Sequence, residues 1–333
     1  PNNSESYWLD KVEQILEACI NLCRIYNNNY VSFDEIHRLV TNRLYYFQKE
    51  QSIRESFFTN SFSKKDCYLL FNSIRFLEND YFSLDSRTFN LLKSEITRIT
   101  NFFVADYDIN KTFCPSKSMI NFNGFKEVIR DGKIVVLNMN IAKYKNLSKI
   151  IATYLKLDFQ SEVLSQLSSS SSIERPTVFI SDEYQEYVTS SDADFFSQSR
   201  ESKCINIIST QSYSSIINAL NNTNASRVII QSLVNKIWFR TEDVFTIEEI
   251  QKQIGKEEKQ KVSRTISENS KESFYNALSN DFVSLNSNLS ESVNSYTQSD
   301  YIYDYHFFTQ ELSTFSSLCF LSDGNKILPP SRL

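Results

Sequence analysis

Two carboxylates that follow an apolar run are the residues of this sequence best suited to chemistry. Residues 178–181 read Val-Phe-Ile-Ser, and Asp182 and Glu183 come directly after them. In a parallel sheet, the carboxyl ends of the strands face the ligand crevice. There the first carboxylate can hold a water bound to Mg²⁺, and the second can polarise a water that attacks a phosphate. An ordinary solvated strand exit has the same pattern, so the motif alone does not separate the two interpretations.

A glutamine after a second predicted strand favours the hydrolytic interpretation. The apolar segment 204–209 is followed by Thr210 and Gln211. If the two strands are parallel neighbours, the carboxamide of Gln211 comes near the same crevice as Glu183. It can there sense a γ-phosphate or orient the attacking water. A glutamine that caps the following helix is the alternative.

The first hundred or so residues have the spacing of helices. Apolar side chains recur every three or four positions from residue 8 to residue 23, and again over 66–78 and 86–103. Ser32, with Glu35 three residues later, predicts a capping box at the start of another helix. We therefore expect an all-helical subdomain over residues 5–105.

Residues 106–333 alternate between short apolar runs and helical patterns. Helices are predicted around 147–155, 194–201, 212–221 and 247–254, and strands over 133–139, 177–180, 204–209, 234–239 and 315–321. Strands separated by helices of about ten residues predict an α/β fold, a mainly parallel sheet flanked by helices. The serines at 168–172 predict a surface loop, and residues 256–300 are polar without a clear pattern.

Composition and charge narrow the class of protein. A net charge of -5 over 333 residues argues against a uniformly basic nucleic-acid-coating protein. It leaves room for a local basic surface or for a pore built from several subunits. None of the apolar runs approaches the roughly 20 residues that span a bilayer. Six scattered cysteines and two histidines offer no metal-ligand spacing, and they fit a reducing, cytoplasmic setting.

Several segments, taken in order, resemble the TraG/TraD-like coupling proteins of type IV secretion and conjugation. These are P-loop ATPases of the FtsK/HerA group of DNA-pumping motors. The segments are Asp182-Glu183-Tyr184, Ser199-Arg200-Glu201, Ile208-Ser209-Thr210-Gln211-Ser212 and Asn235-Lys236-Ile237-Trp238-Phe239. The resemblance extends over nearly the whole chain. It implies a RecA-like nucleotide-binding domain, of which residues 106–333 are the C-terminal part, with the all-helical subdomain inserted in it.

The resemblance also implies roles for individual residues. Asp182 would be the Walker B acid, which holds Mg²⁺ through a water, and Thr210 would help to bind ATP. Glu183 would be the catalytic carboxylate, and Gln211 would contact the γ-phosphate.

Arg200 would be an arginine finger that reaches the nucleotide of a neighbouring subunit in a ring. A finger supplied in this way can be worth ~10³–10⁵ in rate. A surface ion pair of Arg200 with Glu201 or Glu186, worth less than ~1 kcal/mol, is the alternative.

The sequence departs from this family at the phosphate-binding loop. That loop needs the pattern Gly-x-x-x-x-Gly-Lys-Ser/Thr, whose backbone amides cradle the phosphates. The sequence has two Gly-Lys pairs. Gly255-Lys256 has Ile250 and Glu257 where the first glycine and the hydroxyl residue should be, and Gly132-Lys133 has Glu127 and Ile134 there. We therefore expect the C-terminal part of a longer protein, cut after its Walker A segment and inactive by itself.

The function implied by the resemblance is that of a homo-hexameric translocase. It would use ATP and Mg²⁺ to couple a relaxosome, with its relaxase and single-stranded DNA, to a type IV secretion channel. It would act at the cytoplasmic face of the bacterial cell membrane, through an anchor upstream of this chain. Two alternatives stay open: a non-catalytic substrate-recognition adaptor, and a HerA/FtsK-type DNA translocase without a secretion role.

Overall fold

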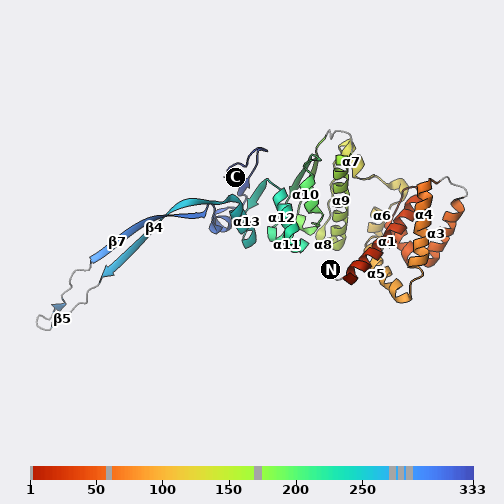
Figure 1. Ribbon diagram of the computed structural model, residues 1–333, viewed down its shortest axis with the longest axis horizontal. Helices are drawn as coiled ribbons and strands as arrows, with labels where there is room; N and C mark the ends of the chain where they lie inside the picture. The colour runs from red at the N-terminus through yellow and green to blue at the C-terminus, as the bar shows by residue number, and fades with distance from the viewer. Residues whose placement is uncertain (1–2, 58–61, 169–174, 270–274, 277–280, 283–287) are drawn as a thin grey trace. The chain divides into compact units, whose positions relative to one another are not determined.

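The chain divides into two compact units, Pro1–Gly124 and Phe125–Leu333. The structure is a computed structural model, and it describes residues 3–57, 62–168, 175–269, 275–276, 281–282 and 288–333 (Figure 1). None of the helices formed by these residues is both long and apolar enough to cross a membrane.

Unit 1 is helical, as its apolar spacing predicts. Its elements are α1 (Asn3–Tyr26), α2 (Phe33–Thr41), α3 (Arg43–Ser56), α4 (Lys64–Phe76), the π-helical turn η1 (Leu77–Tyr81), α5 (Ser86–Val104), α6 (Tyr107–Phe113) and the 3-10 turn η2 (Lys117–Met119). One core joins the helices from α1 to α5, and Ile15, Leu39, Ile53 and Ile96 are at most 1% exposed in it.

Half of the predicted capping box forms at the start of α2. The Oγ of Ser32 accepts the backbone N–H of Glu35 at 3.2 Å. The carboxylate of Glu35 does not complete the box, because it accepts the Tyr45 hydroxyl at 2.8 Å instead.

Unit 2 combines helices with short strands. Its helices are α7 (Phe125–Asp131), α8 (Ile141–Tyr144), α9 (Asn146–Ser165), η3 (Gln166–Ser168), η4 (Tyr184–Glu186), α10 (Asp192–Gln198), α11 (Tyr213–Leu220), α12 (Thr223–Ser232), α13 (Val244–Ile254) and η5 (Phe307–Glu311). Its strands are β1 (Thr177–Ser181), β2 (Cys204–Ile208), β3 (Lys236–Phe239), β4 (Lys256–Asn269), β5 (Tyr275–Asn276), β6 (Asp281–Phe282), β7 (Asn288–Tyr301), β8 (Ser317–Phe320) and β9 (Ser331–Arg332).

The predicted parallel pairing joins β1 to β2, with Val178 opposite Ile205 and Ile180 opposite Ile207. The α9 helix covers one face of this pair, where the rings of Phe159 and Phe179 stack with centroids 5.7 Å apart. The predicted strand over 315–321 also forms, as β8. It lies between β3 and β9 and is antiparallel to both. The predicted α/β fold with a parallel sheet and a helical part is thus present.

One strand prediction is wrong. Residues 133–139 form no strand and take part in none of the strand pairings among the described residues. Ile134 is 90% exposed and Val136 is 81% exposed, although an apolar run of this kind is typical of a strand buried on both faces. A strand needs a neighbour to pair its backbone groups, and this segment has none there.

The polar segment after residue 255 holds a strand pair that the apolar pattern does not reveal. β4 and β7 form an antiparallel ribbon with 14 paired residues in each strand (Figure 1). Over 256–266 and 291–301, where burial is described, most side chains on both faces are exposed, so the sequence lacks the apolar alternation that marks a half-buried strand. Of the predicted serine loop, Ser168 ends η3, and residues 169–172 lie outside the described residues.

Candidate functional site

The carboxyl ends of β1 and β2 lie side by side, because the two strands are parallel and in register. Two backbone hydrogen bonds continue the pairing beyond the strands. The N–H of Ser209 donates to the carbonyl of Ser181 at 2.9 Å, and the N–H of Tyr184 donates to the carbonyl of Ser209 at 2.9 Å. The segments that follow the two strands are therefore fixed against each other.

This edge brings the predicted residues Asp182, Glu183, Thr210 and Gln211 into one polar cluster. The Nε2 of Gln211 donates to Oε2 of Glu183 at 3.2 Å. The Nε2 of Gln185 donates to the same oxygen, and its Oε1 accepts the Thr210 hydroxyl at 2.8 Å. The strand-end argument thus places Gln211 correctly beside Glu183.

Asp182 belongs to the same cluster and stays accessible. Its Oδ1 accepts the hydroxyl of Ser209 and the backbone N–H of Glu183, the latter at 3.0 Å. Asp182 and Gln211 are exposed, and Glu183 is half-buried. Two carboxylates, two amides and two hydroxyls therefore gather at one open sheet edge.

Glu183 has a backbone conformation that is unusual for a residue with a side chain. Its φ of 48° and ψ of 45° lie in the left-handed region. Such a conformation costs ~1–3 kcal/mol and persists only where the surrounding structure imposes it. The carboxylate of the predicted catalytic residue is therefore held by a strained turn.

Arg200 lies away from this cluster. It comes after α10 and before β2, at the opposite edge of the β1–β2 pair from Asp182 and Glu183. Arg200 is exposed, and among the described residues it forms an ion pair with neither Glu201 nor Glu186. Glu186 instead pairs with Lys149 at 2.7 Å. Within one chain, the structure does not bring Arg200 to the other predicted site residues.

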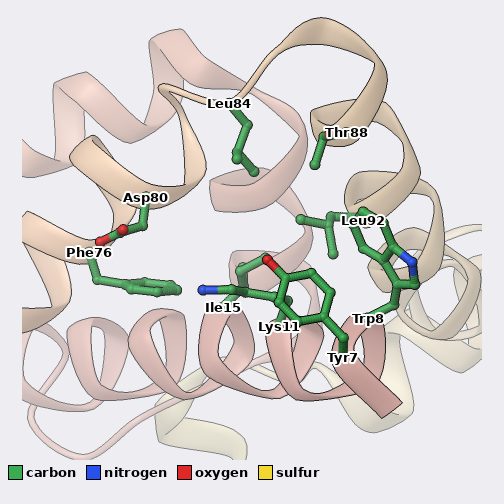
Figure 2. Close-up of a pocket in the computed structure, with 9 residues that line it drawn as sticks. All are labelled: Tyr7, Trp8, Lys11, Ile15, Phe76, Asp80, Leu84, Thr88 and Leu92. Carbon is green, nitrogen blue, oxygen red and sulfur yellow. The ribbon is translucent and has the colours of Figure 1, made fainter. Parts of the chain in front are cut away.

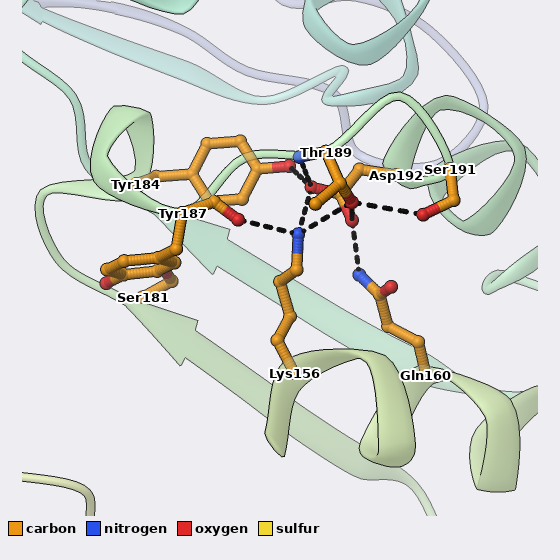
Figure 3. A network of polar contacts seen from close by, with 8 residues as sticks. All are labelled: Lys156, Gln160, Ser181, Tyr184, Tyr187, Thr189, Ser191 and Asp192. Atoms are coloured by element: carbon orange, nitrogen blue, oxygen red, sulfur yellow. Dashed lines mark hydrogen bonds and ion pairs between the residues drawn. The ribbon is translucent and has the colours of Figure 1, made fainter. Parts of the chain in front are cut away.

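A buried ion pair lies behind the turn, and the sequence reasoning missed it (Figure 3). Nζ of Lys156 in α9 meets Oδ2 of Asp192 in α10 at 2.5 Å, and the two side chains are 2% and 0% exposed. Burial lowers the pKa of Lys156, although the negative charge of Asp192 acts in the opposite direction. Burial, with the neighbouring Asp192 charge, raises the pKa of the Tyr184 hydroxyl, which donates to Asp192.

A sequence signal for this pair exists in α9. Lys156 and Gln160 are spaced by four residues and share a helix face with Phe159 and Val163. Polar residues within an apolar stripe are candidates for a buried network, because a buried charge needs a partner. The sequence does not reveal the partner Asp192, which is 36 positions away.

The oxygen atoms of this polar cluster could bind a magnesium ion, but the chain lacks the loop that would bind the phosphates of a nucleotide. Mg²⁺ takes oxygen ligands and usually keeps several waters, with one or two carboxylates from the protein. Asp182, exposed and beside the Ser209 hydroxyl, can supply such a ligand. The 333 residues contain no Gly-x-x-x-x-Gly-Lys-Ser/Thr segment, so they do not supply the phosphate cradle.

Unit 1 has a separate pocket of about 210 Å³ (Figure 2). Tyr7, Trp8 and Phe76 line it together with Lys11 and Asp80. The ammonium of Lys11 lies 5.8 Å from the centre of the Phe76 ring. None of the predicted site residues lines this pocket.

Comparison with known proteins gives a family match over the region that holds the site. Residues 176–300 match the family model described as "TraM recognition site of TraD and TraG". No curated protein matches the chain in sequence.

Solved structures share the fold. The bacterial conjugative coupling protein TrwBdeltaN70 in its unbound monoclinic form has a TM-score of 0.57 and 11% identity, and the match covers 100% of this chain. The trigonal form of that protein with sulphate has a TM-score of 0.57 and 11% identity, over 98% of this chain. The plasmid coupling protein TrwB in complex with the non-hydrolysable GTP analogue GDPNP has a TM-score of 0.52 and 11% identity, over 97% of this chain.

The chain spans 64% of the length of the monoclinic TrwB structure and 63% of the trigonal one. At 11% identity these structures establish the fold, whereas the family model matches the segment from β1 into β7. Residues 176–300 are thus similar to the TraG/TraD family model, and the chain shares its fold with the conjugative coupling protein TrwB.

Proposed function

We propose that this chain belongs to an ATP-hydrolysing motor that couples DNA and its relaxosome to a type IV secretion channel. The observation that carries the proposal is the contact between Glu183 and Gln211 at the edge where β1 and β2 end. The match of residues 176–300 to the TraG/TraD family model supports it.

The cluster can divide the work of hydrolysis among its residues. Asp182 is placed to hold Mg²⁺ through a water, and the bound ion would neutralise charge on the phosphate oxygens. Glu183 can accept a proton from the attacking water. Gln211, hydrogen-bonded to Glu183, can orient that water or sense the γ-phosphate, and Thr210 supports the cluster through Gln185.

Hydrolysis in this proposal needs a phosphate cradle that these 333 residues do not contain. The chain by itself would therefore be inactive, and the complete protein would be the ATPase. The complex of TrwB with a GTP analogue supports nucleotide binding by this fold.

Assembly into a ring gives Arg200 its role in the proposal. Arg200 lies at the opposite sheet edge from Glu183 and is exposed, so it can act only on a nucleotide of a neighbouring subunit. A homo-hexamer anchored at the cytoplasmic face of the membrane would place it there. Single-stranded DNA and a secretion channel would be the other partners.

A recognition role without catalysis is the second candidate. The family model over residues 176–300 is described as a TraM recognition site, and this segment includes β4 and most of β7. An adaptor of this kind would bind a relaxosome protein, and Asp182 and Glu183 would have no catalytic role in it. ATP hydrolysis by the complete protein separates the two candidates.

The experiment is ATP hydrolysis by the protein expressed from the entire reading frame. We expect Glu183→Gln to lower kcat by ~10²-fold or more, because it removes the proton acceptor. Glu186→Gln is the matched control, because Glu186 lies three residues away and makes a partly exposed ion pair with Lys149. Hydrolysis that is undiminished in Glu183→Gln would rule out the assignment of Glu183.

A further inference from the structure

The buried carboxylate of Asp192 collects more hydrogen bonds than an ordinary helix-capping residue. Oδ2 accepts from Nζ of Lys156 at 2.5 Å, from the Tyr184 hydroxyl at 2.5 Å and from the Thr189 N–H at 2.9 Å. Oδ1 accepts from Nε2 of Gln160 at 2.9 Å and from the Thr189 hydroxyl at 3.1 Å. Figure 3 shows these donors converging on Asp192 from α9, η4 and the segment before α10.

Stability alone does not account for this arrangement. Removing two charges from water has a large desolvation cost, and well-packed apolar residues often replace a buried ion pair without loss of stability. An ion pair of this kind does select one geometry, because other arrangements leave a buried charge without a partner.

Two connections lead from the ion pair to the strained turn at Glu183. The first is Tyr184, whose hydroxyl donates to Asp192 and whose backbone N–H donates to the carbonyl of Ser209. The second is Tyr187, whose carbonyl accepts Nζ of Lys156 at 2.9 Å and whose hydroxyl donates to the carbonyl of Asp182.

These connections hold the turn on both sides of Glu183. Asp182 precedes the left-handed residue and Tyr184 follows it, and each is fastened to the Lys156–Asp192 pair directly or through one side chain. A left-handed glutamate needs such support.

We propose that Lys156, Asp192 and Tyr184 are positioning residues, which hold the left-handed turn at Glu183 so that its carboxylate meets Gln211. The inference rests on the proposed function for the catalytic role of Glu183. The geometry of the turn is tested without that role.

The test compares two variants that each remove one neutral donor from Asp192. Tyr184→Phe deletes the hydroxyl that links Asp192 to the turn and keeps the ring. Gln160→Met deletes a donor on α9 that has no contact with the turn. Asp192→Asn is less suitable, because it leaves the ammonium of Lys156 buried without its counter-charge and can unfold the unit.

The first readout is amide hydrogen exchange in the 333-residue chain. The exchange rate of the backbone amide of residue 184 is divided by that of Val163, a fully buried residue of α9. We expect this ratio to rise about tenfold or more in Tyr184→Phe, because a hydrogen bond to a charged group is lost. In Gln160→Met the ratio stays at the wild-type value. Equal changes in both variants, or no change in Tyr184→Phe, would overturn the inference.

The second readout is ATP hydrolysis by the complete protein. Tyr184→Phe should lower kcat and leave KM unchanged, since it displaces a catalytic carboxylate and not a binding group. A change in KM alone would contradict the positioning role. If Glu183→Gln keeps full hydrolysis, the proposed function fails, and the exchange ratios still decide whether the network holds the turn.

Discussion

Lys156 is the single residue on which most of the buried network depends. Its side chain is 2% exposed, and its ammonium donates to Asp192, to the carbonyl of Tyr187 and to the hydroxyl of Thr189. Its removal leaves the carboxylate of Asp192 charged and buried without a counter-charge. The cost therefore exceeds that of any surface ion pair in the same helix.

We predict that Lys156→Met lowers the free energy of unfolding of unit 2 by ~3–5 kcal/mol, the usual effect of breaking a buried ion pair. Lys149→Met is the control. Lys149 is also in α9, but its pair with Glu186 is partly exposed and should be worth at most ~1 kcal/mol. Urea denaturation of both variants measures the difference. Similar losses in the two variants would show that the buried pair has no special weight.

At the residue scale, the sequence predicts which side chains meet at the candidate site better than it predicts the buried contacts that hold them in place. Asp182, Glu183 and Gln211 follow apolar runs, and parallel pairing is enough to bring them together. The left-handed conformation of Glu183 and the partner of Lys156 depend on how α9 and α10 pack, which no local pattern encodes.

At the scale of elements, the start of α2 gives a direct test of a cap. The hydroxyl of Ser32 accepts the N–H of Glu35, one of the donors that the helix itself leaves unpaired. We predict that Ser32→Ala lowers the thermal stability of the helical unit by the equivalent of ~1 kcal/mol. Ser94→Ala, at an exposed position inside α5, should have no effect or a slightly stabilising one. Equal destabilisation by both variants would contradict the capping role.

Elements were predictable where burial repeats with a regular period. The helices α1, α2, α4 and α5 and the strands β1 and β2 have apolar faces, and the sequence predicts these elements. Most side chains of the β4–β7 ribbon over 256–266 and 291–301 are exposed on both faces. Its pairing there rests on backbone hydrogen bonds, which do not depend on the type of side chain. For residues 133–139 the prediction was wrong for the opposite reason. The segment is apolar enough for a buried strand, but it has no partner strand in the described part of the chain.

At the scale of the whole molecule, the two units have separate cores. The core that contains Ile15, Leu39 and Ile96 draws only on residues of unit 1, and the cores around Tyr184 and Trp238 draw only on unit 2. A unit with its own core has what it needs to fold alone.

We therefore predict that residues 1–124 fold without the rest of the chain. Circular dichroism should show a helical spectrum and a single cooperative thermal transition. Ile53→Ala should lower the midpoint strongly, because Ile53 is 0% exposed and its truncation costs ~2–5 kcal/mol. A helical spectrum without a cooperative transition would mean that unit 1 needs another part of the protein.

The central claim is that Glu183 and Gln211 act together in ATP hydrolysis, and a double-mutant cycle tests it most directly. The measurement is kcat of the complete protein with Glu183→Gln, with Gln211→Leu and with both changes. If the two side chains serve one step through their 3.2 Å contact, the double variant should lose little more than the worse single variant. Losses that multiply would mean that the two residues act independently, and full activity in all three variants would mean that this sheet edge is not the hydrolytic site.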